Sequence, residues 1–137
     1  MLKKIIFTHL IFILLIANST IKAEEPDPRV LVSIPEESLQ LMRKDMKELL
    51  TALTEIMQSL STGDFKIAAE IAENRMGKSA MGKHRGTGMG PGRFMPIPMR
   101  KIAWGLHDSA SEFATIAIKG DAKQAYIALN NVMSHCE

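Results

Sequence analysis

The chain of 137 residues has few cysteines and few aromatic side chains. It has one cysteine, one tryptophan and one tyrosine, so no disulfide can form within it. After the first 23 residues, no stretch is apolar for long enough to span a bilayer, which takes roughly 20 residues. No segment alternates apolar and polar residues, which argues against a β-sheet. Stability must therefore come from helix packing or from a bound group.

The N-terminus has the pattern of an export signal. Two lysines precede an apolar run over residues 5–17, and Ala23 offers a small residue before two glutamates. This pattern predicts a signal peptide at 1–23 and a periplasmic protein without a stable membrane anchor after cleavage. Three of the 17 basic residues lie in this leader, which leaves 14 basic against 15 acidic residues. Such a balance does not favour nucleic-acid binding.

The rest of the chain has the apolar spacing of helices. After an extended segment at 24–35, apolar residues recur every three or four positions in four stretches. These stretches cover residues 39–60, 65–76, 99–117 and 122–136. The sequence therefore predicts an all-α fold at 36–137, an antiparallel four-helix bundle with one long crossing between helices 2 and 3.

Helix boundaries are marked by turn and cap residues. Gly63 and Gly120 end the first and third stretches, and Asp121 with Gln124 forms a capping box for the last. Asp64 is expected to cap the second helix, and Ser33 with Glu36 to cap the first.

The crossing at 77–98 is predicted to be a flexible basic loop. It holds six of the nine glycines and three prolines, and no acidic residue occurs between Arg75 and His107. It is also rich in methionine. Because thioether and imidazole ligands suit copper(I) in an exported protein, Met81, His84 and Met89 are candidate copper ligands. The alternative is a loop whose methionines only cover the bundle.

Several pieces follow the order of a known family. They are Arg43-Lys-Asp-Met46-Lys47 in the first helix, Leu106-His-Asp-Ser-Ala110 in the third, the Gly120-Asp121 turn, and a last helix with Cys136. Over roughly 36–137 the chain resembles the cytochrome c′ family, periplasmic four-helix bundles that attach haem through Cys-x-x-Cys-His near the end of the last helix. Here the motif is incomplete, because the sequence stops one residue after Cys136.

The resemblance implies haem c held through Cys136, with Met46 at the position of the axial iron ligand in low-spin members. It also implies electron transfer or small-gas binding, a redox partner protein and a homodimer. No catalytic constellation is recognisable, so we do not expect an enzyme. The alternatives are that Met46 is a seam residue of the core, that Cys136 is a plain buried thiol facing the core, and that the chain is a haem-free binding module. His107, beside Asp108, is expected at the polar edge of the third helix.

Overall fold

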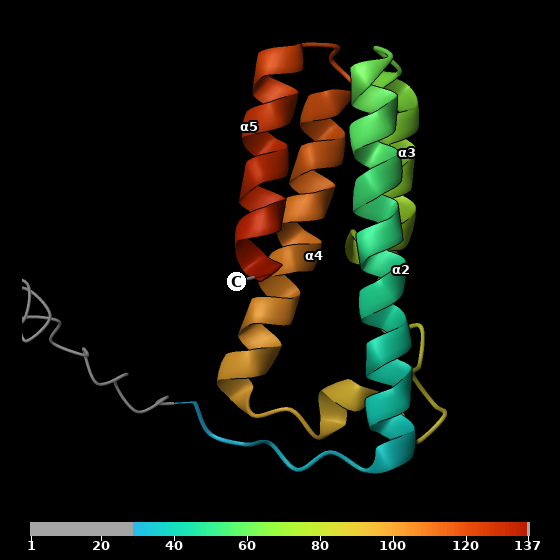
Figure 1. Cartoon of the computed structure of the whole chain (residues 1–137), viewed down its shortest axis with the longest axis vertical. Helices are drawn as coiled ribbons and strands as arrows, with labels where there is room; N and C mark the ends of the chain where they lie inside the picture. Colours follow the sequence, from blue (N-terminus) through green and yellow to red (C-terminus); the bar gives the residue numbers. More distant parts are fainter. Residues whose placement is uncertain (1–28, 137) are drawn as a thin grey trace, which may run out of the picture. The chain divides into compact units, whose positions relative to one another are not determined.

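The computed structural model describes residues 29–136, and this part is all-helical with no strand. It contains four α-helices, as the apolar spacing predicts (Figure 1): α2 (Glu36–Ser61), α3 (Phe65–Arg75), α4 (Ile97–Ala117) and α5 (Ala122–Met133). Three short 3₁₀ helices accompany them: η1 (Lys78–Ala80), η2 (Pro91–Arg93) and η3 (Ser134–Cys136). The proposed signal peptide at 1–23 lies outside the described residues, and 29–35 form neither helix nor strand.

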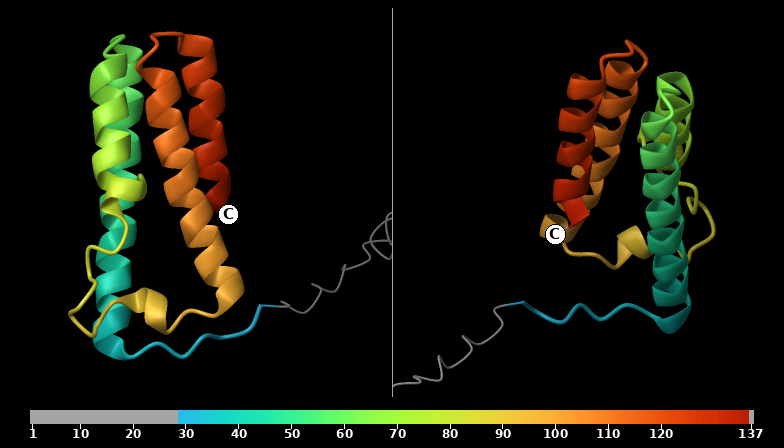
Figure 2. Two further views of the ribbon diagram at one scale, coloured as in Figure 1. Left: turned by 180° about the vertical axis from the view of Figure 1, so that it is seen from behind. Right: turned by 45° about the horizontal axis from the view of Figure 1, so that its top comes forward.

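The described residues from Val32 onward belong to one compact unit, which is built from two helical hairpins. A short turn joins α2 to α3 and another joins α4 to α5, and α3 packs against α4 (Figures 1 and 2). Gly63 and Gly120 lie in these turns with φ of +80° and +76°, a conformation that favours glycine. None of the helices in this part is long and apolar enough to cross a membrane.

A single apolar core connects the four helices. Its largest fully buried side chains are Phe113, Ile56, Met76 and Val132. Around them lie alanines with almost no exposed surface: Ala52, Ala68, Ala72, Ala110, Ala117 and Ala125. Because the axial distance between packed helices depends on the side chains at the contact, these alanines let the helices approach closely.

The caps are only partly as expected. The Asp121 carboxylate accepts a hydrogen bond from the Gln124 amide at 3.1 Å, which confirms the cap of α5. Asp64 precedes α3, but its carboxylate accepts the Thr62 hydroxyl at 2.6 Å and caps no amide of α3. The predicted capping box at Ser33 is wrong, because Pro35 occupies the N-cap of α2 and makes no side-chain cap bond.

The four helices differ strongly in length. α2 has 26 residues and α4 has 21, whereas α3 has 11 and α5 has 12. Figure 2 shows the two pairs diverging toward the end where α2 and α4 continue. Ile102, which the spacing predicts to be buried, lies in that part of α4 and is 51% exposed. The prediction is wrong there, because this turn of α4 lies outside the apolar core that the four helices share.

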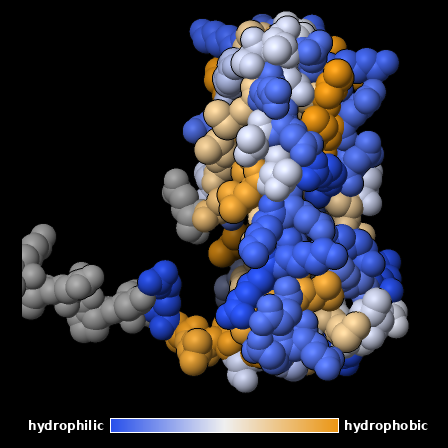
Figure 3. Space-filling model, turned by 45° about the vertical axis from the view of Figure 1, so that its right-hand side comes forward, coloured by the Kyte–Doolittle hydropathy of each residue, from blue (hydrophilic) through white to orange (hydrophobic). Residues whose placement is uncertain are grey.

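The crossing segment between α3 and α4 runs along the N-terminal half of α2, which is more exposed than the half that packs on α3 (Figure 1). It contains η1 and η2, so it has slightly more regular structure than the glycines and prolines predict. On the face drawn in Figure 3, hydrophilic side chains cover most of the lower part of the molecule, and the hydrophobic patches between them are small and separate.

We predict that Phe113→Ala lowers the free energy of unfolding by about 3–5 kcal/mol, because it removes a fully buried ring from the shared core. Urea unfolding followed by circular dichroism measures this loss. Ile67→Ala, at a position that is 50% exposed, serves as the control and should cost about 1 kcal/mol or less. Equal losses in the two variants would contradict a core centred on Phe113.

Candidate functional site: a cationic cavity between α2, α4 and the crossing segment

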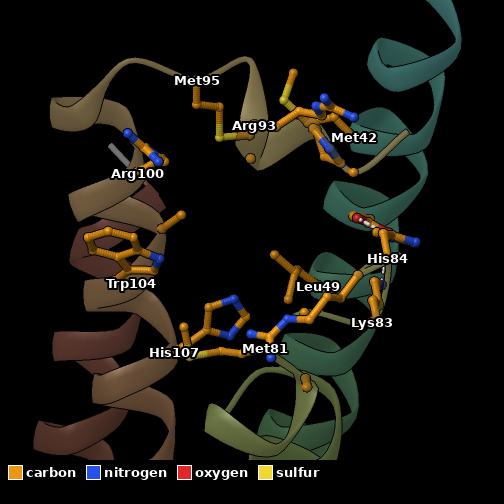
Figure 4. A pocket seen from close by; sticks show the side chains of 18 of the residues that line it. Met42, Leu49, Met81, Lys83, His84, Arg93, Met95, Arg100, Trp104 and His107 are labelled. Carbon is orange, nitrogen blue, oxygen red and sulfur yellow. Dashed lines mark hydrogen bonds and ion pairs between the residues drawn. The ribbon is translucent and has the colours of Figure 1, made fainter. Parts of the chain in front are cut away.

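A cavity of about 610 Å³ lies between the exposed part of α2, the first turns of α4 and the crossing segment. Figure 4 shows its two walls: Arg100, Trp104 and His107 extend from α4, and Met42 and Leu49 from α2. Side chains of the crossing segment line a further side, and the cavity is open to solvent. The volume falls within the range of about 300–1,000 Å³ that is typical of small-molecule and cofactor sites.

The apolar part of the cavity is rich in thioethers. It is lined by Met42, Met46, Met81, Met95 and the indole of Trp104. Met46, the candidate iron ligand, lies on this wall and is 49% exposed, so it is not a buried seam residue of the core. Trp104, the only tryptophan in the chain, is 47% exposed. A large apolar ring and several soft sulfur atoms are thus accessible from one space.

The charged part of the cavity is almost entirely basic. Its lining includes the cationic side chains of Arg75, Lys83, Arg85, Arg93 and Arg100. Within residues 29–136, the guanidinium groups of Arg85, Arg93 and Arg100 form no ion pair. In addition, Arg100 Nε is buried and has no hydrogen-bond partner in this part of the chain. A buried donor without an acceptor is costly, so the cavity favours an anionic ligand.

The one carboxylate of the cavity lining, Asp45 on α2, holds the crossing segment in place. It accepts hydrogen bonds from Lys83 Nζ at 2.8 Å and from His84 Nε2 at 2.9 Å. Lys83 also reaches the Glu48 carboxylate at 3.0 Å, and this hydrogen bond with its charge lowers the pKa of Glu48. Partial burial acts to lower the pKa of Lys83, but the bonds to Asp45 and Glu48 outweigh it and the pKa is raised.

The three candidate copper ligands do not come together in one site. His84 Nε2 faces Asp45, and Met89 does not line the cavity although Met81 and His84 do. Over residues 29–136, no group of three or more His, Cys, Asp and Glu side chains has an arrangement that could hold a metal ion. Copper(I) binding through Met81, His84 and Met89 stays a prediction without a specific contact in its favour.

The C-terminal turn lies beside α4, and none of its residues lines the cavity. η3 packs on α4, and the His135 ring lies so close to Gly105 that a Cβ there would be 2.7 Å from Cε1. Cys136 is exposed, which corrects the expectation that it faces the core. The reason is the change from α-helix to 3₁₀ geometry after Met133, because a tighter turn rotates residue 136 away from the buried face of α5.

His107 is a cavity residue that the sequence does not reveal. Instead of lying at a polar edge, its ring points into the cavity (Figure 4). Its Nδ1 lies 2.6 Å from the Met76 carbonyl oxygen and 3.1 Å from that of Gly77. The available sequence signal is its spacing of three residues from Trp104, which puts both side chains on one face of α4.

The carbonyls that contact His107 belong to a tightly bonded end of α3. The Glu73 carboxylate accepts hydrogen bonds from Ser79 and from Ser111 on α4, and the Lys78 amide donates to the Ser111 hydroxyl at 2.9 Å. Both hydrogen bonds lower the pKa of Glu73, and the one from Ser111 has the larger effect. Gly77 has no room for a side chain, since a Cβ would lie 2.5 Å from Glu73 Oε2.

We predict that Asp45→Asn speeds tryptic cleavage after Lys83 and Arg85 by several-fold, because it removes the charge that holds Lys83 and His84. Limited proteolysis with mass spectrometry measures the rate. Asp108→Asn is the matched control: it breaks the Lys78–Asp108 ion pair, whose side chains are both exposed, and exposed pairs contribute little. Equal acceleration by both variants would show that Asp45 has no special part in holding the segment.

A second prediction concerns acid stability. Since the pKa of Glu73 is lowered in the folded protein, its contribution is present above the ordinary carboxyl pKa of 4.5 and is lost as the pH falls through the lowered value. Glu73→Gln should therefore unfold more easily than the wild type near neutral pH, and the difference should shrink in acid. Urea midpoints at several pH values test this. Glu112→Gln removes an exposed charge from α4 and serves as the control; a constant Glu73→Gln difference at all pH values would contradict the assignment.

Compared with protein-family models, curated proteins and solved structures, the chain matches none of them.

Proposed function

We propose that the cavity binds haem and that the protein is a periplasmic cytochrome c′-like protein for electron transfer or small-gas binding, as the sequence resemblance implies. The observation that carries the proposal is the composition of the cavity. Thioethers and an indole line one part of it, and three guanidinium groups without ion pairs line another. Haem has the matching chemistry, because it is a flat apolar ring with two carboxylates and an iron that accepts sulfur ligands.

The lining residues fit this group in separate ways. Arg100, whose buried Nε lacks an acceptor, would bond a haem carboxylate with the help of charge. Met46 would offer a thioether to the iron, a ligand that raises the reduction potential. The resemblance assigns covalent attachment to Cys136, which is exposed in the turn that packs on α4 and does not itself line the cavity. The haem itself would supply an iron that changes oxidation state or binds a diatomic gas.

The same proposal covers the architecture and the setting. The helices would form an antiparallel four-helix bundle, with which the observed helix contacts are compatible. Residues 1–23 would direct export. A redox partner protein and a second copy of the chain would be its partners, and it would not act as an enzyme.

The direct test is a titration of the purified protein with ferric haem. We expect saturable binding near one haem per chain, a shifted Soret band and quenching of the fluorescence of Trp104, since this indole lines the cavity. Free tryptophan measured at the same haem concentrations corrects for absorption by haem. Absence of saturable binding, or binding that leaves Trp104 fluorescence unchanged, would contradict haem binding in this cavity.

We predict that Arg100→Gln weakens binding of haem by about tenfold, since a hydrogen bond to a charged group contributes about 1.5–3 kcal/mol. The loss should disappear with haem dimethyl ester, whose esterified side chains carry no charge. Lys101→Gln is the control: it removes an adjacent exposed positive charge, and the affinities for haem and for haem dimethyl ester should both change only slightly. If Arg100→Gln weakened both forms of haem equally, the guanidinium would not be recognising a carboxylate.

A further inference from the structure

The His107 ring is held in one tautomer by its surroundings. Its Nδ1 faces two backbone carbonyl oxygens, those of Met76 at 2.6 Å and Gly77 at 3.1 Å. A carbonyl oxygen only accepts hydrogen bonds, so Nδ1 must carry the proton that it donates. In the neutral ring the lone pair is therefore on Nε2. Among residues 29–136, no hydrogen-bond partner faces Nε2, and the ring points into the cavity.

The carbonyls that orient the ring are themselves fixed. Met76 is fully buried, and its amide donates to the Ala72 carbonyl at the end of α3. The Gly77 amide donates to the carbonyls of Ala72 and Glu73. Ser111, one turn beyond His107 on α4, is bonded to the Glu73 carboxylate and ties α4 to the same place. Such a supporting set is what fixes ring orientation in metal sites, where the second ring nitrogen usually donates to a carbonyl or a carboxylate.

The other two histidines in this part of the chain are held differently. His84 also lines the cavity, and because its Nε2 donates to the Asp45 carboxylate, at 3.2 and 2.9 Å from the two oxygens, the lone pair of its neutral ring is on Nδ1. That ring, however, belongs to the crossing segment and not to a helix. His135 lies against Gly105 and does not line the cavity. Within residues 29–136, His107 is thus the one histidine that lines the cavity from a helix and has no hydrogen-bond partner at Nε2.

We propose that His107 Nε2 is the nitrogen ligand that this chain offers to the iron of a haem in the cavity. The inference rests on the proposed function and adds to it a residue on α4. The sequence resemblance provides only a sulfur ligand, Met46, within the chain. A neutral imidazole whose other nitrogen donates to a carbonyl is a good iron ligand, because that hydrogen bond fixes the ring and increases its basicity.

The test compares His107→Asn with His84→Asn in the full chain. Asn at 107 keeps an N–H donor close to the place of Nδ1, so the bond to Met76 is preserved while Nε2 is removed. Two quantities are measured with ferric haem: the dissociation constant, from Trp104 quenching, and the iron ligation, from electron paramagnetic resonance and the Soret band. Circular dichroism checks that both variants are folded.

His84→Asn removes the competing imidazole of the cavity. We expect the wild type and His84→Asn to share a nitrogen-ligated signature that His107→Asn lacks; loss of that signature in a folded His84→Asn protein, with His107→Asn unchanged, would assign the ligand to His84 instead. Affinity should fall in His107→Asn by more than the roughly 10- to 100-fold that loss of a supporting residue costs a metal site. A second variant, His107→Ala, leaves a space at the ring position, and added imidazole should restore the signature there. This rescue separates a missing ligand from a damaged fold.

The results that would contradict ligation by His107 differ from those that would contradict haem binding itself. If haem binds the wild type and His107→Asn with the same affinity and the same signature, His107 is not a ligand, while haem binding itself stands. If imidazole fails to restore the signature in a folded His107→Ala protein, the ligand assignment is also overturned. If the wild type shows no saturable binding, both the proposed function and the role of His107 are wrong.

Discussion

The site depends on the point at which α3 ends. α2 and α4 have 26 and 21 residues but α3 has 11, so both long helices continue past its end. There η2 of the crossing segment packs on α2, and the two long helices present apolar side chains, such as Met42 and Trp104, to the cavity. The crossing segment has to cover this surface. Because it is an irregular chain rich in glycine, it covers the surface incompletely, and the remaining space is the cavity.

The crossing segment has no negative charge of its own, so it is held by carboxylates from the helices. Glu73 of α3 binds its beginning through Ser79, and Asp45 of α2 binds Lys83 and His84 further along. Both carboxylates are bonded to two different residues. Of these two carboxylates, only Asp45 binds basic side chains of the segment, those of Lys83 and His84. Arg85 and Arg93 are left without a counter-charge in the described chain. The positive character of the cavity follows from this uneven supply of carboxylates.

The sequence predicted features that depend on one helix and missed those that depend on where a second element ends. Periodicity located the four helices, and glycine located the two tight turns, because both are local properties. The exposure of Ile102 was missed because it depends on which turns of α4 the other helices cover. The exposure of Cys136 depends on a change to 3₁₀ geometry that side-chain spacing does not announce. The orientation of His107 depends on a carbonyl 31 residues earlier, which only the path of the crossing segment brings close.

Gly105 has a consequence for the geometry of the C-terminal turn. It lies beside Trp104 in sequence, and the His135 ring occupies the place where a side chain at 105 would be. The separation between α4 and the turn that carries Cys136 is therefore set by the absence of one carbon atom. A group attached at residue 136 would inherit that separation, so its distance from α4 would be decided on α4 rather than on the helix that bears the cysteine.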